Sequence, residues 1–432
     1  MITLTGIICL IFTLWQIPKI RRNGIINPLL LVVLQHFIFF GYDQKNSERP
    51  AEFQVLIATC TTLYLAAFWL ISTYTKSSDL SKLTLNTINI SGGIGRHISE
   101  SNIIKFSAAA LAFNYLTYWY LYEYNLIAVL LRMYSINFDT DRPYAALIVA
   151  TNNLFIKLLL ACIFICRYLE LTKERRTKKS YIVFTIFLMI AIPLGTRGNI
   201  LLAGIAFFLG GMVFKARHGK LDTSRSTQAI IASCLVLFAA LSLLRSQDLT
   251  SDDFSLSSTL QESFQKQGDK EISPTVNDHL YFTLTTFNSK LEPLGPDTFF
   301  GIATNLIPRS IWSDKPIGFG KRLAMLDGGT LEGPSYAAGY IGEGWANFGL
   351  LGTFVFAIIF GSISGFLGGL ALRFLLSGKI IAMIVGLLLY NSSIIFVRGD
   401  MLSAWAQGVY PVAISFMLLW LYRVLSKQTQ GT

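Results

Sequence analysis

Charged residues are scarce in this chain. They make up 14% of its 432 residues, against roughly a quarter in ordinary soluble domains. Apolar residues account for 53% instead. This composition excludes a soluble globular protein and an intrinsically disordered one.

Cysteine is also scarce, and the common catalytic motifs are missing. The chain has no CxxC pair; its five cysteines, all in or beside apolar runs, are Cys9, Cys60, Cys162, Cys166 and Cys234. We therefore expect neither a disulfide framework nor structural zinc. Walker A, GxSxG and HExxH patterns are absent, which argues against an ATP-driven pump, a serine hydrolase and a zinc protease.

Long apolar runs fill most of the chain. A bilayer core about 30 Å thick requires about 20 apolar residues per helix. Eleven such runs begin near Ile2, Pro28, Phe53, Ile103, Ala145, Tyr181, Asn199, Ala229, Phe348, Ile380 and Leu402. The sequence predicts an all-α polytopic membrane protein with about 11 transmembrane helices. No basic stretch precedes the first run, so we expect a retained span and not a signal peptide.

Basic residues gather in short loops, which sets the predicted orientation. Three clusters belong on the cytoplasmic side by the positive-inside rule: Lys19 to Arg22, Lys173 to Lys179, and Lys215 to Arg225. Alternation then places the N-terminus outside and the C-terminus inside. Because topology accounts for the net charge of +11, we predict a membrane-lipid environment and no nucleic-acid partner.

One segment is long enough to fold outside the bilayer. Residues 245–347 hold eight Lys or Arg and thirteen Asp or Glu, so they lack the positive bias of a cytoplasmic loop. The predicted organisation is therefore residues 1–244 with about eight helices, this large extracytoplasmic loop, and residues 348–432 with about three helices. The second half of the loop is apolar and aromatic, which predicts short helices on the membrane surface.

Several arginines lie on the predicted outer face, where the positive-inside rule does not require them. They are Arg132, Arg142, Arg197, Arg309 and Arg398. Arg197 and Arg398 each end an apolar run, so an anion, a carboxylate or backbone carbonyls must compensate their desolvation. Alternatively, they extend to the outer headgroups or pair with acids such as Asp400. Several guanidinium groups on one face could bind the same phosphate ligand, because each binds phosphate oxygens through two parallel hydrogen bonds. A lipid pyrophosphate is such a ligand.

Three residues are candidate proton acceptors. Glu343 lies in the motif GYIGEGWANFGLLGTFVFAIIFG, where it either accepts a proton from a sugar hydroxyl or clamps an arginine. His279, next to Asp278 in the outer loop, is either a proton acceptor or an ordinary surface histidine. The glycines of the motif have an alternative role in close helix packing. Asp139 and Asp141 form a DxD pattern, but a salt-bridged turn with Arg142 is favoured, so no metal is assigned.

Four motifs in order carry a family resemblance: LGTRGNILLAG, NLIPRSIWSDKP, GEGWANFGLLG and VRGD, between Leu194 and Asp400. Together with the spans and the long loop, they resemble the O-antigen polymerase family, the Wzy-type oligosaccharide repeat-unit polymerases of bacterial envelopes. The resemblance implies transfer of a growing polysaccharide from undecaprenyl pyrophosphate onto a new carrier-linked repeat unit, on the periplasmic face of the inner membrane. It implies no cofactor, and it brings in a chain-length regulator and a flippase as candidate partners.

The resemblance also implies residue roles. It assigns pyrophosphate binding to the external arginines Arg197, Arg309 and Arg398, with Arg132 and Arg142 added. It does not fix the base, so Glu343, Asp278 and His279 stay open. An O-antigen ligase, which has a similar build, and a lipid-linked oligosaccharide flippase or other transporter remain alternatives. A transporter should carry charged residues near the bilayer midplane, whereas here they gather at the outer face.

Overall fold

The computed structural model describes most, but not all, of the chain. The described residues are 3–23, 28–41, 49–77, 99–122, 145–172, 178–193, 197–218, 276–287, 291–304, 312, 316–329, 335–397, 401–410, 413 and 417. The chain divides into two compact units. The first consists of Met1–Ser91 with Ser273–Thr432, and the second of Gly92–Ile272.

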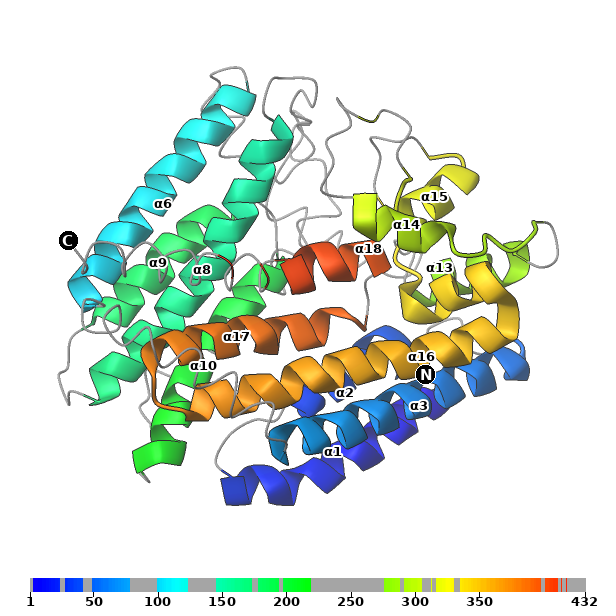
Figure 1. The fold of residues 1–432 in the computed structure, drawn as a ribbon, viewed down its shortest axis with the longest axis horizontal. Coiled ribbons are helices and arrows are strands. Elements are labelled where there is room, and N and C mark those ends of the chain that lie inside the picture. The colour runs from blue at the N-terminus through cyan, green and yellow to red at the C-terminus, as the bar shows by residue number, and fades with distance from the viewer. Residues whose placement is uncertain are drawn as a thin grey trace, which may run out of the picture. The chain divides into compact units, whose positions relative to one another are not determined.

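Helices make up both units (Figure 1). The first unit contains α1 (Leu4–Asn23), α2 (Pro28–His36), the π-helix η1 (Phe37–Gly41), α3 (Ala51–Ser77), α13 (Val276–Thr286), α14 (Asp297–Thr304), α15 (Phe319–Leu326), α16 (Gly339–Leu376), α17 (Ile380–Ile395), α18 (Met401–Ala404) and the π-helix η4 (Trp405–Val409). The second contains α6 (Glu100–Leu121), α8 (Ala145–Thr172), α9 (Lys179–Ala191) and α10 (Arg197–His218). Within the described residues there is no β-strand, which confirms the predicted all-α class.

The apolar runs of the sequence become helices. Nine of the eleven predicted starts lie within three residues of the start of a described helix. The start at Phe348 falls inside α16, and the start at Ala229 lies outside the described residues. Three described helices are long and apolar enough to cross a membrane: Ala51–Thr75, Asn199–His218 and Gly339–Leu376. These helices support a membrane protein, while the number of spans stays a prediction.

Local signals explain several helix boundaries. At the start of α6, the Ser99 hydroxyl accepts a hydrogen bond from the Asn102 amide at 3.2 Å, which satisfies a donor that has no partner within the helix. Between α16 and α17, Gly378 adopts a φ of +76°. The left-handed conformation ends the first helix and lets the next begin two residues later.

The helix α16 is broken near its beginning. The backbone leaves helical geometry at Phe348 and at Gly349, whose φ of +63° and ψ of −151° lie in a region essentially restricted to glycine. In Figure 1 the gold ribbon of α16 turns back on itself at its right-hand end. The break separates a short segment, residues 339–347, from a long segment, residues 350–376. The apolar run predicted to start at Phe348 is this long segment.

Backbone groups released by the break find new partners. The Ala346 carbonyl accepts a hydrogen bond from the Leu294 amide at 2.8 Å, and the Asn347 carbonyl accepts one from Gly295 at 3.1 Å. A helix break in an apolar environment is tolerated only when such groups are satisfied. The chain entering α14 therefore stabilises the end of the short segment.

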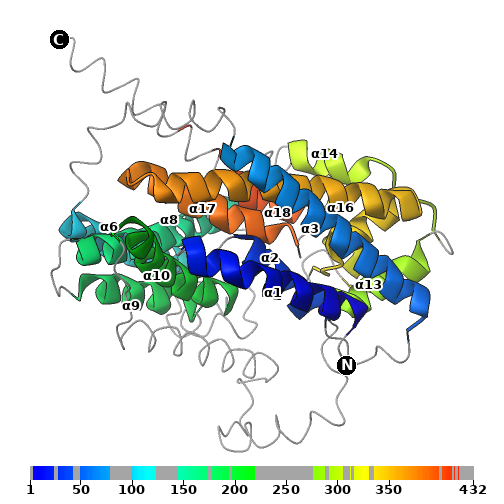
Figure 2. The ribbon, with the colours of Figure 1, turned by 90° about the horizontal axis from the view of Figure 1, so that it is seen from below.

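Close helix packing, the alternative role of the motif glycines, is present in the structure. Gly344 and Gly352 bring the backbones of the short and long segments into contact, so that a Cβ on either would overlap the other segment. Farther along, Gly361 lies against the backbone of Tyr64 on α3. Figures 1 and 2 both show α3 beside α16, which is its main packing partner. Small residues at these points let helices approach closely in a membrane, where packing drives association.

Candidate active site

The structure describes the three candidate proton acceptors and only part of the arginine set. Glu343, Asp278 and His279 all belong to the first unit. Arg197 is the first residue of α10 in the second unit, and its side chain is outside the described part. Four other arginines lie outside the described residues: Arg132, Arg142, Arg309 and Arg398. Pyrophosphate binding by these arginines therefore stays a prediction.

Glu343 is completely buried on the short segment of α16. Its Oε2 atom accepts a hydrogen bond from the Met401 amide at 2.5 Å. Met401 is the first residue of α18, and an amide at that position has no acceptor within its own helix. A carboxylate is well suited to satisfy it, because it adds a negative charge where the helix presents unsatisfied N–H groups. The bond joins the motif GEGWANFGLLG to the residue that directly follows VRGD.

Asp278, in the first turn of α13, forms an ion pair with Arg49. The Arg49 Nη2 atom lies 2.6 Å from Asp278 Oδ1, and the exposed fractions of the two side chains are 4% and 23%. The guanidinium carbon also lies 5.2 Å from the ring centre of Phe53 and 5.0 Å from that of Tyr281. Cation–π contact of this kind holds an arginine that has left water. The pair ties the segment before α3 to α13.

Arg49 was missed by the sequence analysis although a signal for it was present. It stands between the second and third apolar runs, and alternation of the predicted spans places that loop outside. The same criterion that selected five other arginines applies to it. Its partner, 229 residues away, was not readable from the sequence.

His279 packs against Tyr336 in a parallel ring stack, with centroids 4.1 Å apart and an angle of 14° between the planes. Its Nδ1 atom accepts a hydrogen bond from the Ala337 amide at 3.2 Å. Because the amide is the donor, Nδ1 is unprotonated and the neutral ring carries its proton on Nε2. The nitrogen with the lone pair is thus engaged in holding the chain that enters α16.

Tyr336 makes a second contact on the same segment. Its hydroxyl donates a hydrogen bond to Asp327 Oδ2 at 2.7 Å. This bond raises the pKa of Tyr336 above its ordinary value, because the donor proton is held by a carboxylate. Tyr336 therefore stays neutral at physiological pH and keeps its place over His279.

The helix α13 places Asp278 and His279 beside the segment that carries Glu343. It packs on α16, with Leu280 and Thr283 next to Gly342. All three candidate proton acceptors thus belong to two elements in contact. Within the part of the chain that the structure describes, no group of three or more His, Cys, Asp or Glu side chains is arranged to hold a metal ion. The Asp139–Asp141 pattern lies outside that part.

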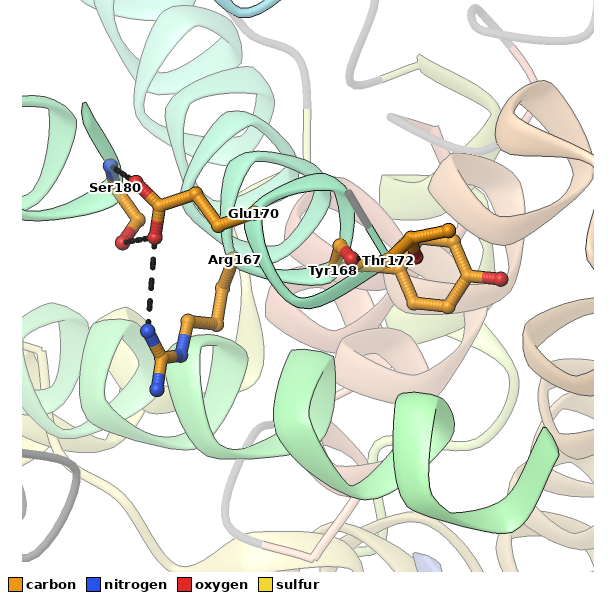
Figure 3. A network of polar contacts seen from close by, with 5 residues as sticks. All are labelled: Arg167, Tyr168, Glu170, Thr172 and Ser180. Carbon is orange, nitrogen blue, oxygen red and sulfur yellow. Dashed lines mark hydrogen bonds and ion pairs between the residues drawn. The ribbon is translucent and has the colours of Figure 1, made fainter. Parts of the chain in front are cut away.

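The second unit contains a polar cluster of a different kind, the Arg167 cluster, shown in part in Figure 3. Glu170 accepts hydrogen bonds from the Ser180 amide at 2.8 Å and from its hydroxyl at 2.5 Å. The Arg167 Nη1 atom lies 3.5 Å from Glu170 Oε2. Nearby in the chain, Lys179 Nζ lies 3.1 Å from Glu100 Oε2. These five residues join the end of α8 to the starts of α9 and α6.

These observations define a multi-pass, all-α membrane protein with a buried carboxylate beside a helix break. The family model described as O-antigen polysaccharide polymerase Wzy matches residues 32–429, nearly the whole chain. The chain belongs to this family, as its motifs indicated, and the match begins within α2, well before the first of those motifs. Comparison with curated proteins and with solved structures gave no match.

Proposed function

We propose that this protein joins undecaprenyl-pyrophosphate-linked oligosaccharide repeat units into O-antigen or a similar surface polysaccharide, at the periplasmic face of the bacterial inner membrane. Membership of the Wzy family is the observation that carries the polymerase activity. The charge distribution along the sequence supports the periplasmic face, because the basic clusters belong to the opposite side. A chain-length regulator and a flippase are the partners proposed with it.

The proposed reaction is an in-line displacement at a sugar carbon. A hydroxyl oxygen of the acceptor repeat unit forms a bond to the anomeric carbon of the carrier-linked chain. The bond from that carbon to the phosphate oxygen breaks, and its electron pair leaves with undecaprenyl pyrophosphate. Attack from the opposite side inverts the anomeric configuration, and the hydroxyl proton passes to a carboxylate. The pyrophosphate linkage supplies the free energy, so the step needs neither a nucleotide nor a metal.

Glu343 is the proposed base. It is buried, and it is bonded to Met401, three residues after Arg398 in the sequence. Three residues of chain span at most about 11 Å, so an arginine and a carboxylate from separate motifs are candidates for one site. The pairing of Asp278 with Arg49 and the bond to Nδ1 of His279 favour supporting roles for those two residues.

The external arginines are the proposed stabilisers of the leaving group. Negative charge grows on the pyrophosphate as the bond to carbon breaks, and preorganised guanidinium groups stabilise it most in a site shielded from water. Arg197, Arg309 and Arg398 are proposed for this role first, with Arg132 and Arg142 in addition.

The substitution Glu343→Gln tests the base. Glutamine keeps an oxygen that accepts the Met401 hydrogen bond, but it does not take up the hydroxyl proton. Purified protein supplied with synthetic carrier-linked repeat units should lose activity by about 100-fold or more, with its thermal stability nearly unchanged. A variant that polymerises at close to the normal rate would show that Glu343 only anchors α18.

Lysine substitutions test the arginines one at a time. Arg197→Lys, Arg309→Lys and Arg398→Lys keep the charge but lose the bidentate fork, so each should shorten the ladder of polysaccharide on a gel. Arg322→Lys is the matched control in the same predicted loop. The control arginine pairs with Asp297 only at 3.9 Å and is partly exposed. Ladders equally long in all four variants would refute bidentate pyrophosphate binding.

Two other activities remain to be separated from polymerisation. Deletion of a polymerase leaves lipopolysaccharide capped with single repeat units, whereas deletion of a ligase leaves finished polymer on its carrier. A flippase reconstituted in liposomes would move carrier-linked units across the bilayer without lengthening them.

A further inference from the structure

A buried histidine joins two helices of the first unit. His36 is the last residue of α2 and has no exposed surface. Its Nδ1 atom lies 2.9 Å from the Val32 carbonyl oxygen, which only accepts hydrogen bonds, so Nδ1 carries the proton. Its Nε2 atom lies 3.2 Å from the Tyr340 hydroxyl. In the neutral ring Nε2 is the acceptor, and Tyr340 is therefore the donor. The two bonds fix both the tautomer and the orientation of the ring.

Tyr340 belongs to the segment that carries the proposed base. It lies three residues before Glu343 on the short segment of α16, and positions three apart share one helix face. Its ring is enclosed by Tyr64, Phe40 and Phe360, with centroids 5.0, 6.5 and 6.0 Å away. Aromatic packing limits where the ring lies, and the hydrogen bond to His36 fixes how the hydroxyl points.

The support under His36 is itself held in place. Directly after it the chain enters η1, a single π-helical stretch, and such stretches are frequent at functional sites. The Thr3 hydroxyl donates to the Phe40 carbonyl at 2.8 Å, and the Thr3 amide donates to the Gly41 carbonyl at 3.1 Å. The residue that precedes α1 thereby binds the last two carbonyls of the π-helix, and this holds the backbone directly after His36 in place.

We propose that His36 is a positioning residue for Glu343. Through Tyr340 it sets the rotation and depth of the short segment of α16, and so the direction of the carboxylate. This inference rests on the proposed role of Glu343 as the base. A polar ring in a membrane helix is costly unless both of its nitrogens find partners. Here Nδ1 is bonded to Val32 on the same helix, and Nε2 is left to hold Tyr340 on α16.

Four variants test the bond itself. His36→Leu removes both hydrogen bonds, Tyr340→Phe removes only the hydroxyl, and the double variant removes both partners. His36→Gln keeps a donor and an acceptor and is the rescue variant. With purified protein and carrier-linked repeat units, each single variant should lower kcat roughly 10- to 100-fold, as for a misplaced reacting group, with KM little changed. The double variant should be no slower than the slower single variant, and His36→Gln should recover most of the activity.

Two results would overturn the proposal: a folded Tyr340→Phe protein with normal kcat, or effects of the single variants that multiply in the double variant. If His36→Leu fails to fold, Tyr340→Phe and His36→Gln still test whether the hydrogen bond between His36 and Tyr340 positions Glu343. A second readout does not depend on activity: the alkylation rate of Glu343→Cys in a background without native cysteines should change when Tyr340→Phe is added. An unchanged rate contradicts positioning. A changed rate, combined with an unaltered protein that does not polymerise carrier-linked repeat units, would leave positioning standing and reject the proposed function.

Discussion

The Arg167 cluster and the surroundings of Glu343 are two places where the structure shows how a buried carboxylate of this chain is bound. In the Arg167 cluster, carboxylates face cations: Glu170 faces Arg167, and Glu100 faces Lys179. Glu343 accepts a hydrogen bond from the backbone amide of Met401, at the start of α18. Removing a charge from water is costly, and opposite charges offset much of that cost. The comparison teaches that the first arrangement joins helix ends through side chains of opposite charge, whereas the second joins a carboxylate beside a helix break to the backbone at the start of another helix.

The two regions also differ in how far apart in the sequence their contacting residues lie. In the Arg167 cluster, Arg167 and Glu170 are one helical turn apart, and Ser180 follows ten residues after Glu170. Around Glu343 the contacts join distant parts of the chain, as in His36 with Tyr340. The part of the first cluster made by Arg167, Glu170 and Ser180 is therefore local, whereas its ion pair between Lys179 and Glu100 joins α9 to α6. The second depends on the fold of the whole unit.

The largest effect should come from breaking the ion pair between Arg167 and Glu170. Arg167→Leu leaves the Glu170 carboxylate buried without its guanidinium, which should cost about 3–5 kcal/mol of stability. Thermal unfolding in detergent measures the loss. Polymer formed per folded molecule should stay normal, because the cluster takes no part in the reaction. The double variant Arg167→Leu with Glu170→Leu should recover part of the stability. If Arg167→Leu kept full stability but lost activity, the structural role assigned to the Arg167 cluster would be wrong.

An intermediate effect should follow from Gly349→Ala. Its backbone conformation is nearly closed to residues with a Cβ, so the cost should be roughly 1–3 kcal/mol. Activity should fall with stability, since Gly349 shapes the break that supports the short segment of α16. Gly301→Ala is the matched control, because a Cβ there would meet no atom within 4 Å and alanine favours the helix. Equal effects of the two substitutions would mean that the break does not depend on glycine.

The smallest effect should be that of Arg49→Lys. Lysine keeps the charge opposite Asp278 but loses the planar group over Phe53 and Tyr281, a loss of about 0.5–1 kcal/mol. The difference in thermal stability from the unaltered protein measures it. Arg322→Lys, in an exposed pair, should show no measurable change. A larger loss in the exposed pair than in the buried one would contradict the role assigned to Arg49.

Much of the fold was predictable because apolar length and helix ends are local properties. The run that starts at Ile380 becomes α17 from its first residue, and the start predicted at Phe348 marks the break in α16. The three short helices α13, α14 and α15 lie within residues 245–347, as predicted for the loop. Their contact with the membrane surface, the number of spans and the three-part division of the chain stay predictions.

The candidate site was predictable in its residues but not in their contacts. Glu343 stood out because an acid beside an apolar run is costly, and it is indeed wholly buried. Nothing in its neighbourhood in the sequence indicates Met401 as the partner. The roles of Arg49 and His36 could not be predicted, because each side chain binds a residue more than 200 positions away in the sequence.

By itself, the sequence determined the class of molecule: an all-α membrane protein of the Wzy family, with basic clusters that predict its orientation. Composition, hydropathy and motif order suffice for this because they act within one stretch of chain at a time. The tertiary structure alone decided that α16 folds back at Gly349, that Glu343 meets the start of α18, and that His36 holds Tyr340. Those contacts depend on packing among helices that are distant in sequence, so the hydropathy pattern of any single helix does not predict them.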